Sequence, residues 1–148
     1  MRPYIPLFEE KKSTEELIQF INEFASKFEK AYFMRGMGLI IELDEYDTAV
    51  SLDIKPFDGR VHIGSVLVSE EHRGKGLASK LMTQLIRLAD NKNVELDLEV
   101  HPFGKKGLNK IQLRNWYLSL GFKQKANNRD ILVYIPNQPI KLTGKFKK

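Results

Sequence analysis

Apolar residues recur along this chain with two different spacings, and segments with one spacing alternate with segments with the other. Spacings of three and four residues predict amphipathic helices over residues 14–28, 77–89 and 110–120. Strict alternation of apolar and polar residues, or a short apolar run between turn residues, predicts a strand. The strands expected on this basis are residues 39–43, 48–54, 61–68, 94–100 and 131–135.

Side chains that can cap helices mark two of the expected helix starts. Ser13 and Glu16 form a capping-box signature before the first helix. Asn109 begins a second such signature before the last helix, and Gly121 is typical of a helix end. The pattern also leaves room for a short strand ahead of the first helix and for a short second helix over residues 29–34.

The order of these elements is helix, three strands, helix, strand, helix and two strands, of which the last is residues 131–135 and follows a turn at Asn127 and Asn128. Antiparallel hairpins followed by alternation of strand and helix predict an α/β (α+β) fold. Its sheet should be mixed but mostly antiparallel, with about six to seven strands flanked by helices. A chain of 148 residues is long enough for a single domain, which we expect over residues 1–136, followed by a basic C-terminal tail over residues 137–148.

The composition excludes several kinds of chemistry. The chain has no cysteine, so disulfides, thiolate metal sites and a cysteine nucleophile are excluded. Its histidines, His62, His72 and His101, fit no metal-ligand spacing, so we expect no metal. The first residues lack a signal-peptide pattern and no apolar run reaches the length of a membrane span, so we expect a soluble, cytoplasmic protein with no membrane partner.

The net charge of +5 is unevenly distributed along the chain. Residues 1–60 carry 8 Lys/Arg against 12 Asp/Glu, whereas residues 61–148 carry 16 against 7. Residues 141–148 alone contribute four of the positive charges. A basic arm of this kind can bind nucleic acid through the phosphates; the alternative is a solvated chain end.

A glycine motif, Arg73 to Ala78, joins the expected strand over residues 61–68 to the helix that follows. A strand, a glycine turn and a helix in this order direct unpaired backbone N–H groups and the positive end of the helix dipole to one place, which favours a phosphate. The motif matches neither a Walker A loop nor the dinucleotide fingerprint. On these six residues alone, an ordinary glycine-rich turn is an equal alternative.

A second motif in the chain changes this balance. Arg73-x-x-Gly76-x-Ala78 fits the Gln/Arg-x-x-Gly-x-Gly/Ala signature of the GNAT superfamily of N-acetyltransferases. Residues 116–122, Trp-Tyr-Leu-Ser-Leu-Gly-Phe, resemble the tyrosine-helix-Gly-Phe element of the same family. The two motifs occur in the family's order with one expected strand between them. The sequence therefore resembles a GNAT acyltransferase over roughly residues 61–135.

The resemblance implies acetyl-CoA as the co-substrate and a place for each of its parts. The pyrophosphate would be held by the backbone N–H groups of the glycine motif, which are those of Arg73, Gly74, Lys75, Gly76, Leu77 and Ala78. The pantetheine arm would pair as an added strand with the backbone of Val66, Leu67 and Val68. Asn109 would also contact the pantetheine, although its role as a helix cap explains this residue fully.

The resemblance also implies catalytic residues. Tyr117 would be the general acid that protonates the departing thiolate, and the alternative is a core tyrosine beside Trp116. The acceptor amine must lose a proton, for which Glu99, His101 or a water held by either is a candidate base. These two residues alternate along one expected strand with Glu95 and Asp97, for which a solvated strand face is at least an equal alternative.

The function implied is direct transfer of an acetyl group from acetyl-CoA to an amine in a ternary complex. The acceptor is a small molecule or a protein or peptide, and the acidic N-terminal half favours a cationic one. Two alternatives stay open: a nucleic-acid-associated GNAT that acetylates a base or a charged tRNA, and a coenzyme A-binding module without turnover. A homodimer is a further expectation from the family, with no interface identified.

Overall fold

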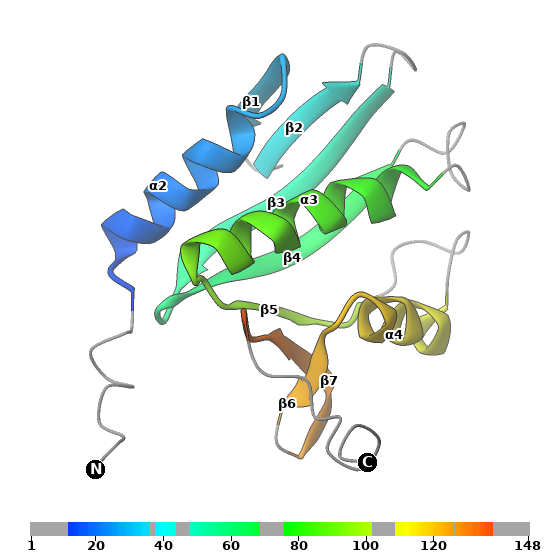
Figure 1. Cartoon of the computed structure of the whole chain (residues 1–148). Helices are drawn as coiled ribbons and strands as arrows, with labels where there is room; N and C mark the ends of the chain where they lie inside the picture. Colours follow the sequence, from blue (N-terminus) through cyan, green and yellow to red (C-terminus); the bar gives the residue numbers. More distant parts are fainter. Residues whose placement is uncertain are drawn as a thin grey trace, which may run out of the picture.

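A computed structural model describes residues 12–35, 38–43, 48–68, 76–101, 109–125 and 127–137. The elements within these ranges are, in chain order, α2 (Thr14–Ala25), β1 (Lys30–Met34), β2 (Gly38–Leu43), β3 (Thr48–Phe57), β4 (Arg60–Val68), α3 (Leu77–Lys92), β5 (Leu96–Glu99), α4 (Lys110–Ser119), β6 (Lys123–Lys125) and β7 (Asn128–Tyr134) (Figure 1). The expected basic tail lies outside the described residues, apart from Asn137. None of the helices described is long and apolar enough to cross a membrane.

Both helix starts that the sequence marks with capping boxes are confirmed. At α2, the Ser13 hydroxyl accepts a hydrogen bond from the backbone N–H of Glu16 (3.2 Å), and the Glu16 carboxylate accepts one from the backbone N–H of Ser13 (2.9 Å). Asn109 and Gln112 make the same reciprocal pair at α4. Each box satisfies two backbone donors that the start of a helix leaves without a partner.

The short helix that the sequence allows over residues 29–34 is wrong, because these residues form strand β1 at the edge of the sheet. β1 pairs antiparallel with β2, with Ala31 opposite Ile41. The Tyr32 hydroxyl also donates a hydrogen bond to the Glu42 carboxylate across the pair (3.0 Å). Aromatic residues such as Tyr32 and Phe33 favour strands, and pairing with β2 decides the conformation of a segment too short to hold a helix by itself.

The strands form one seven-stranded sheet in the order β1-β2-β3-β4-β5-β7-β6. Among the strand pairs described, β4 and β5 run parallel and every other pair is antiparallel. The α/β fold with a mixed, mostly antiparallel sheet flanked by helices is therefore confirmed. β3 is longer than the sequence predicts and β5 is shorter.

The parallel pair is short. It covers only Val61 opposite Leu96, His62 opposite Asp97, and Ile63 opposite Leu98. β4 remains paired with β3 as far as Val68, and β5 remains paired with β7 as far as Glu99. The sheet consequently opens between β4 and β5 beyond Ile63.

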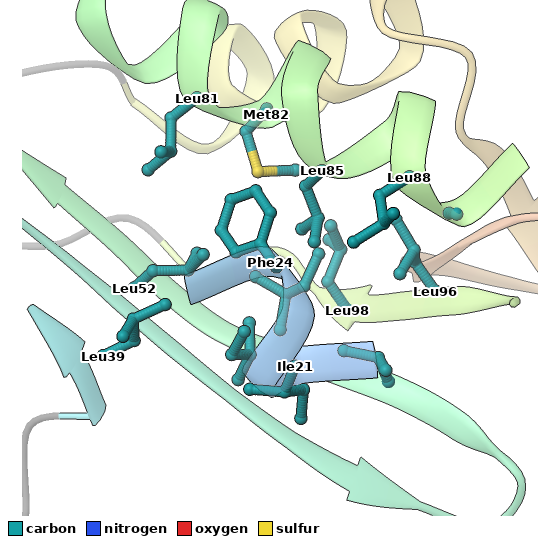
Figure 2. Close-up of a cluster of buried hydrophobic side chains, with 14 of the residues drawn as sticks. Ile21, Phe24, Leu39, Leu52, Leu81, Met82, Leu85, Leu88, Leu96 and Leu98 are labelled. Carbon is teal, nitrogen blue, oxygen red and sulfur yellow. The ribbon is translucent and has the colours of Figure 1, made fainter. Parts of the chain in front are cut away.

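The main core lies between the sheet and two helices that cover the same face, α2 and α3 (Figure 1). Figure 2 shows Phe24 of α2 in the middle of this cluster, with Met82 and Leu85 of α3 on one side and Leu39 and Leu52 of the strands on the other. All five side chains are fully buried. This packing agrees with the amphipathic pattern of the sequence, because each of these residues lies on the apolar face of its helix or strand.

Alternation along β5 places Leu96 and Leu98 in the core, as predicted. The residues of β4 opposite them in the parallel register, Val61 and Ile63, are also buried in the core. Positions of opposite parity, including His62 and Asp97, therefore belong to the other face of the sheet, away from α2 and α3.

Candidate functional site

The edge of β4 that faces the opening carries the predicted pantetheine-binding residues. Val66, Leu67 and Val68 pair through their backbones with Leu52, Ser51 and Val50 of β3. On the other side, Val66 and Leu67 have no pairing with β5 within the described ranges. Val66 packs against the core, whereas Leu67 is 37% exposed. An extended amide-containing ligand can add to such an edge by backbone hydrogen bonds alone.

A β-bulge lies where this opening begins. The register between β3 and β4 shifts between Asp53 and Ile54, so that Gly64 of β4 has no opposite residue. A Cβ on Gly64 would lie 2.5 Å from the Asp53 Oδ2 atom, so a side chain there would require the Asp53 carboxylate to move. Bulges of this kind bend a strand and turn its backbone groups away from the ladder.

Helix α3 begins beside this opening with an uncapped N-terminus. Gly76 is the N-cap residue and has the left-handed conformation (φ +77°). Because glycine has no side chain, no side-chain hydrogen bond caps this helix. The first turn contains no acidic residue. A Cβ added to Gly76 would meet no described atom within 4 Å. The N–H groups of the first turn and the helix dipole therefore favour an anion at this point.

Half of the predicted pyrophosphate-binding motif is described. Gly76 is exposed, Ala78 is half-buried and the Leu77 side chain is buried in the protein. Leu77 can therefore serve a ligand only through its backbone N–H group. The other predicted residues of the motif, Arg73, Gly74 and Lys75, lie outside the described residues.

Tyr117, the predicted general acid, is a buried residue of α4. It is 6% exposed, and its ring packs against Trp116 (centroids 4.8 Å apart) and Phe122 (5.7 Å). Burial raises the pKa of its hydroxyl to about 12. Within the described part of the chain, this hydroxyl has no hydrogen-bond partner. Buried hydroxyls are nearly always paired, so a protonated and unpaired phenol needs a partner that the described protein atoms do not supply.

The two predicted base candidates are brought together at the end of β5. His101 Nε2 lies 3.5 Å from Glu99 Oε2. Both side chains are about half exposed, at 58% and 47%. No contact within the described ranges links this pair to Tyr117.

Another histidine, His62, lies beside a buried carboxylate, and the sequence did not lead us to His62 as a functional candidate. His62 Nδ1 lies 2.9 Å from Asp97 Oδ1, between the neighbouring strands β4 and β5. Asp97 is only 7% exposed, although the sequence places it among solvated residues. The signal was available: a strand, a crossover helix and a next strand predict a parallel neighbour, which puts residues of β5 beside those of β4.

Asn109 acts as the helix cap that its spacing predicts. Its Oδ1 atom accepts a hydrogen bond from the Gln112 backbone N–H (2.8 Å), and the Gln112 Oε1 atom accepts one from the Asn109 N–H (3.0 Å). Its predicted contact with pantetheine stays a prediction. Among the described residues, no cluster of three or more His, Asp or Glu side chains is arranged to hold a metal ion.

Comparison with known proteins places this geometry in a family. The model of the acetyltransferase (GNAT) family matches residues 6–122. No curated protein sequence matches the chain.

This chain is similar to several solved structures. The anti-CRISPR protein AcrVA5 is 18% identical, with 64% of this chain and 95% of that chain covered and a TM-score of 0.50. Ard1 from Thermoplasma volcanium is 16% identical, with 86% and 82% covered and a TM-score of 0.48. The PaiA N-acetyltransferase from Thermoplasma acidophilum, solved in complex with coenzyme A, is 19% identical, with 85% and 73% covered and a TM-score of 0.45.

Proposed function

The chain belongs to the acetyltransferase (GNAT) family, and from this premise we propose that it transfers an acetyl group from acetyl-CoA directly to an amine in a ternary complex. The observation that carries the proposal is the opening of the sheet between β4 and β5, beside the uncapped N-terminus of α3. The opening supplies a strand edge for an amide-containing arm, and the N-terminus of α3 supplies N–H donors for a pyrophosphate.

The residues of the opening fit coenzyme A by the chemistry of its parts. The amides of the pantetheine arm match the backbone edge at Val66 and Leu67, with Val68 next along the strand. The pyrophosphate matches the N-terminal turn of α3 at Gly76, Leu77 and Ala78. The sequence motif also contains two cationic residues, Arg73 and Lys75, whose role toward the pyrophosphate stays a prediction. Acetyl-CoA supplies the thioester, whose carbonyl carbon accepts the amine.

Tyr117 is the proposed general acid for the leaving group. When the amine nitrogen bonds to the carbonyl carbon, the C–S bond breaks and the sulfur leaves as a thiolate. A phenol whose pKa burial raises to about 12 is protonated at neutral pH, so it can donate to that thiolate. Its hydroxyl has no partner within the described ranges, which supports a role toward a ligand rather than toward the core.

The acceptor amine loses a proton in the same reaction. Glu99 and His101 are the bases that the sequence suggests, and their half-exposed positions suit the passage of that proton to solvent. We propose an amine acceptor of small-molecule or peptide type, with a cationic amine favoured by acidic residues of the N-terminal half. Of the acidic residues among the strands of that half, Glu42, Asp53 and Asp58 are described.

The test is thermal unfolding with and without acetyl-CoA, for the unmodified protein and for Gly76→Asp and Gly76→Asn. Asp and Asn have the same size and both tolerate a positive φ, so the two variants differ mainly by a negative charge at the proposed pyrophosphate position. Acetyl-CoA at 100 times its Kd should add roughly 2.7 kcal/mol of stability, or about 5–10 °C in Tm for a domain of this size.

We expect the shift to survive in Gly76→Asn and to be lost in Gly76→Asp. An equal shift in both variants would contradict the proposed site, and no shift of the unmodified protein at millimolar acetyl-CoA would contradict the function. Release of free thiol in the presence of a panel of amines then separates a transferase from a binding module without turnover. Salt-dependent binding of RNA or DNA without an acetyl-CoA shift would instead support a nucleic-acid binder.

A further inference from the structure

His62 and Asp97 form a histidine–carboxylate pair at the point where the sheet opens. They are opposite each other in the middle of the three parallel pairs that join β4 to β5, and His62 Nδ1 lies 2.9 Å from Asp97 Oδ1. The next pair, Ile63 with Leu98, is the last before the strands separate. The imidazole therefore lies on the strand that carries the proposed path of the thioester arm, four residues before Val66.

The surroundings of the pair hold the carboxylate more firmly than the imidazole. The Asp97 side chain is 10% exposed, and its Oδ2 atom lies 4.0 Å from Arg60 Nη1. Arg60 is itself held by Glu95, with 3.0 Å between Nε and Oε1. The His62 side chain is 30% exposed. The Asp97 carboxylate is thus held in place, whereas the His62 ring is open to solvent and to a substrate.

Other groups near the pair of His62 and Asp97 come from β3 and from the turn after it. Lys55 of β3 is opposite His62 in the antiparallel register. The Phe57 ring packs against the His62 ring edge to face, with centroids 6.2 Å apart. Asp58 lies 3.9 Å from Arg60. No metal-ligand cluster is present here among the described residues.

Hydrogen-bond chemistry selects one tautomer of His62. A carboxylate can only accept, so in the neutral imidazole Nδ1 donates to Asp97 and Nε2 keeps its lone pair. Nε2 has no partner within the described ranges. An imidazole oriented by a carboxylate in this way is the arrangement that general bases of hydrolases use.

The pair also lies on the suitable side of the sheet. His62 and Asp97 alternate with the buried residues Val61 and Leu98, so they belong to the face that α2 and α3 leave uncovered. Tyr117, by contrast, belongs to the buried core cluster. A base and an acid on different sides of the opening suit a reaction in which the amine arrives from one side and the thiolate departs toward the other.

We propose that His62 is the general base of the acetyl transfer and that Asp97 is its positioning residue. This inference rests on the proposed function. His62 Nε2 takes a proton from the amine nitrogen as that nitrogen bonds to the carbonyl carbon; the C–S bond breaks, and Tyr117 gives a proton to the sulfur. The proton that His62 has taken then passes to solvent, to which its side chain is 30% exposed.

The experiment uses two nucleophiles that need no acceptor pocket, water and hydroxylamine, with saturating acetyl-CoA. Water is so weak a nucleophile that a base must remove its proton as it attacks, whereas neutral hydroxylamine is a strong nucleophile that can attack first and lose its proton to solvent afterwards. His62→Gln should therefore lose about a hundredfold of the hydrolysis rate while transfer to hydroxylamine falls only a few-fold. Glu15→Gln, at an exposed position of α2 outside the proposed site, is the control and should keep both rates within about twofold.

Two further variants keep the test decisive. Asp97→Asn should lower the ratio of hydrolysis to hydroxylamine transfer in the same sense as His62→Gln, whereas a merely structural role would lower both rates together. In His62→Ala, free imidazole should restore hydrolysis. Each variant must keep the thermal shift with acetyl-CoA, which reports folding and co-substrate binding without using turnover.

Unchanged hydrolysis in His62→Gln, or an equal loss with both nucleophiles and no rescue by imidazole, would overturn the assignment while leaving the acetyltransferase function in place. Transfer to hydroxylamine without any hydrolysis by the unmodified protein would also overturn it. Absence of any thermal shift with acetyl-CoA would instead remove the proposed function, and the role of His62 with it.

Discussion

The indole Nε1 of Trp116 donates a 2.8 Å hydrogen bond to the hydroxyl of Ser79, 37 residues earlier in the chain. Ser79 lies in the first turn of α3, and Trp116 precedes Tyr117 in α4. The bond therefore joins the helix start proposed for the pyrophosphate to the helix that carries the proposed acid. A shift of either helix alone would strain a partly buried, well-formed contact.

Removing this bond should show coupling between the two helices. We expect Trp116→Phe and Ser79→Ala each to lower the free energy of unfolding, and the double-mutant cycle to give a coupling of about 1 kcal/mol. Urea unfolding followed by circular dichroism measures this, because Trp116 is the sole tryptophan and its fluorescence is lost in one variant. Additive effects of the two substitutions would show that the bond does not couple the helices.

Tyr117→Phe should slow acetyl transfer without weakening the binding of acetyl-CoA. The substitution removes the proton that the thiolate receives, which should lower the rate by about a hundredfold or more. Since the leaving group is the same for every nucleophile, rates with water and with hydroxylamine should fall together. Retention of full activity with either nucleophile would remove Tyr117 from the mechanism.

The same residue should make the fold sensitive to alkali. Burial raises the pKa of Tyr117 from 10.0 to about 12, so the folded state holds this proton more tightly than the unfolded state. The stability that this difference in pKa gives the folded state is fully present below about pH 10. It is lost between about pH 10 and pH 12, where the free energy of unfolding should fall by about 2–3 kcal/mol. Urea unfolding across this pH range checks it. In Tyr117→Phe this component of the decline should be absent.

Gly121→Ala should destabilise the protein by about 1–3 kcal/mol. The backbone at Gly121 has φ +108°, and a Cβ there would lie 3.1 Å from Cε1 of the Tyr134 ring. Gly76→Ala is the matched control, since it has a positive φ but no described atom within 4 Å of the added Cβ. Thermal unfolding should therefore show a larger loss at position 121. Equal losses would mean that backbone conformation alone sets the cost.

Asn109 offers a test of cap against ligand. Asn109→Ala should cost about 1 kcal/mol of stability, whereas Asn109→Asp keeps an oxygen for the Gln112 N–H and should cost little. Both variants should show the acetyl-CoA thermal shift of the unmodified protein if the residue is only a cap. A stable Asn109→Asp variant with a reduced shift would support the predicted contact with pantetheine.

Local signals in the sequence predicted much of this fold. Ser13 and Asn109 marked both capped helices, and the alternation around Leu96 and Leu98 identified the core face of β5. These features depend on neighbours within a few residues, so a sequence pattern can carry them. The glycine motif and the segment around Tyr117 indicated the family for the same reason.

What the sequence did not predict depends on distant neighbours. β1 is a strand because β2 lies beside it, and Asp97 is buried because β4 brings His62 and Arg60 over it. The periodicity of β5 assigned Asp97 to a polar face, which is correct, but only the parallel register with β4 determines what covers that face. The histidine–carboxylate pair was missed because the strand order suggests that β4 and β5 are neighbours, but the residue-by-residue register between them cannot be derived from either strand alone.

The three-residue parallel link between β4 and β5 has a consequence for folding cooperativity. The strands before it and the strands after it share few ladder hydrogen bonds, so local opening between the two groups should need less free energy than opening within either group. A molecule bound along the β4 edge would bridge them. Amide hydrogen exchange should then slow at β4 and β5 when acetyl-CoA binds, and the co-substrate would act as a missing strand of the fold.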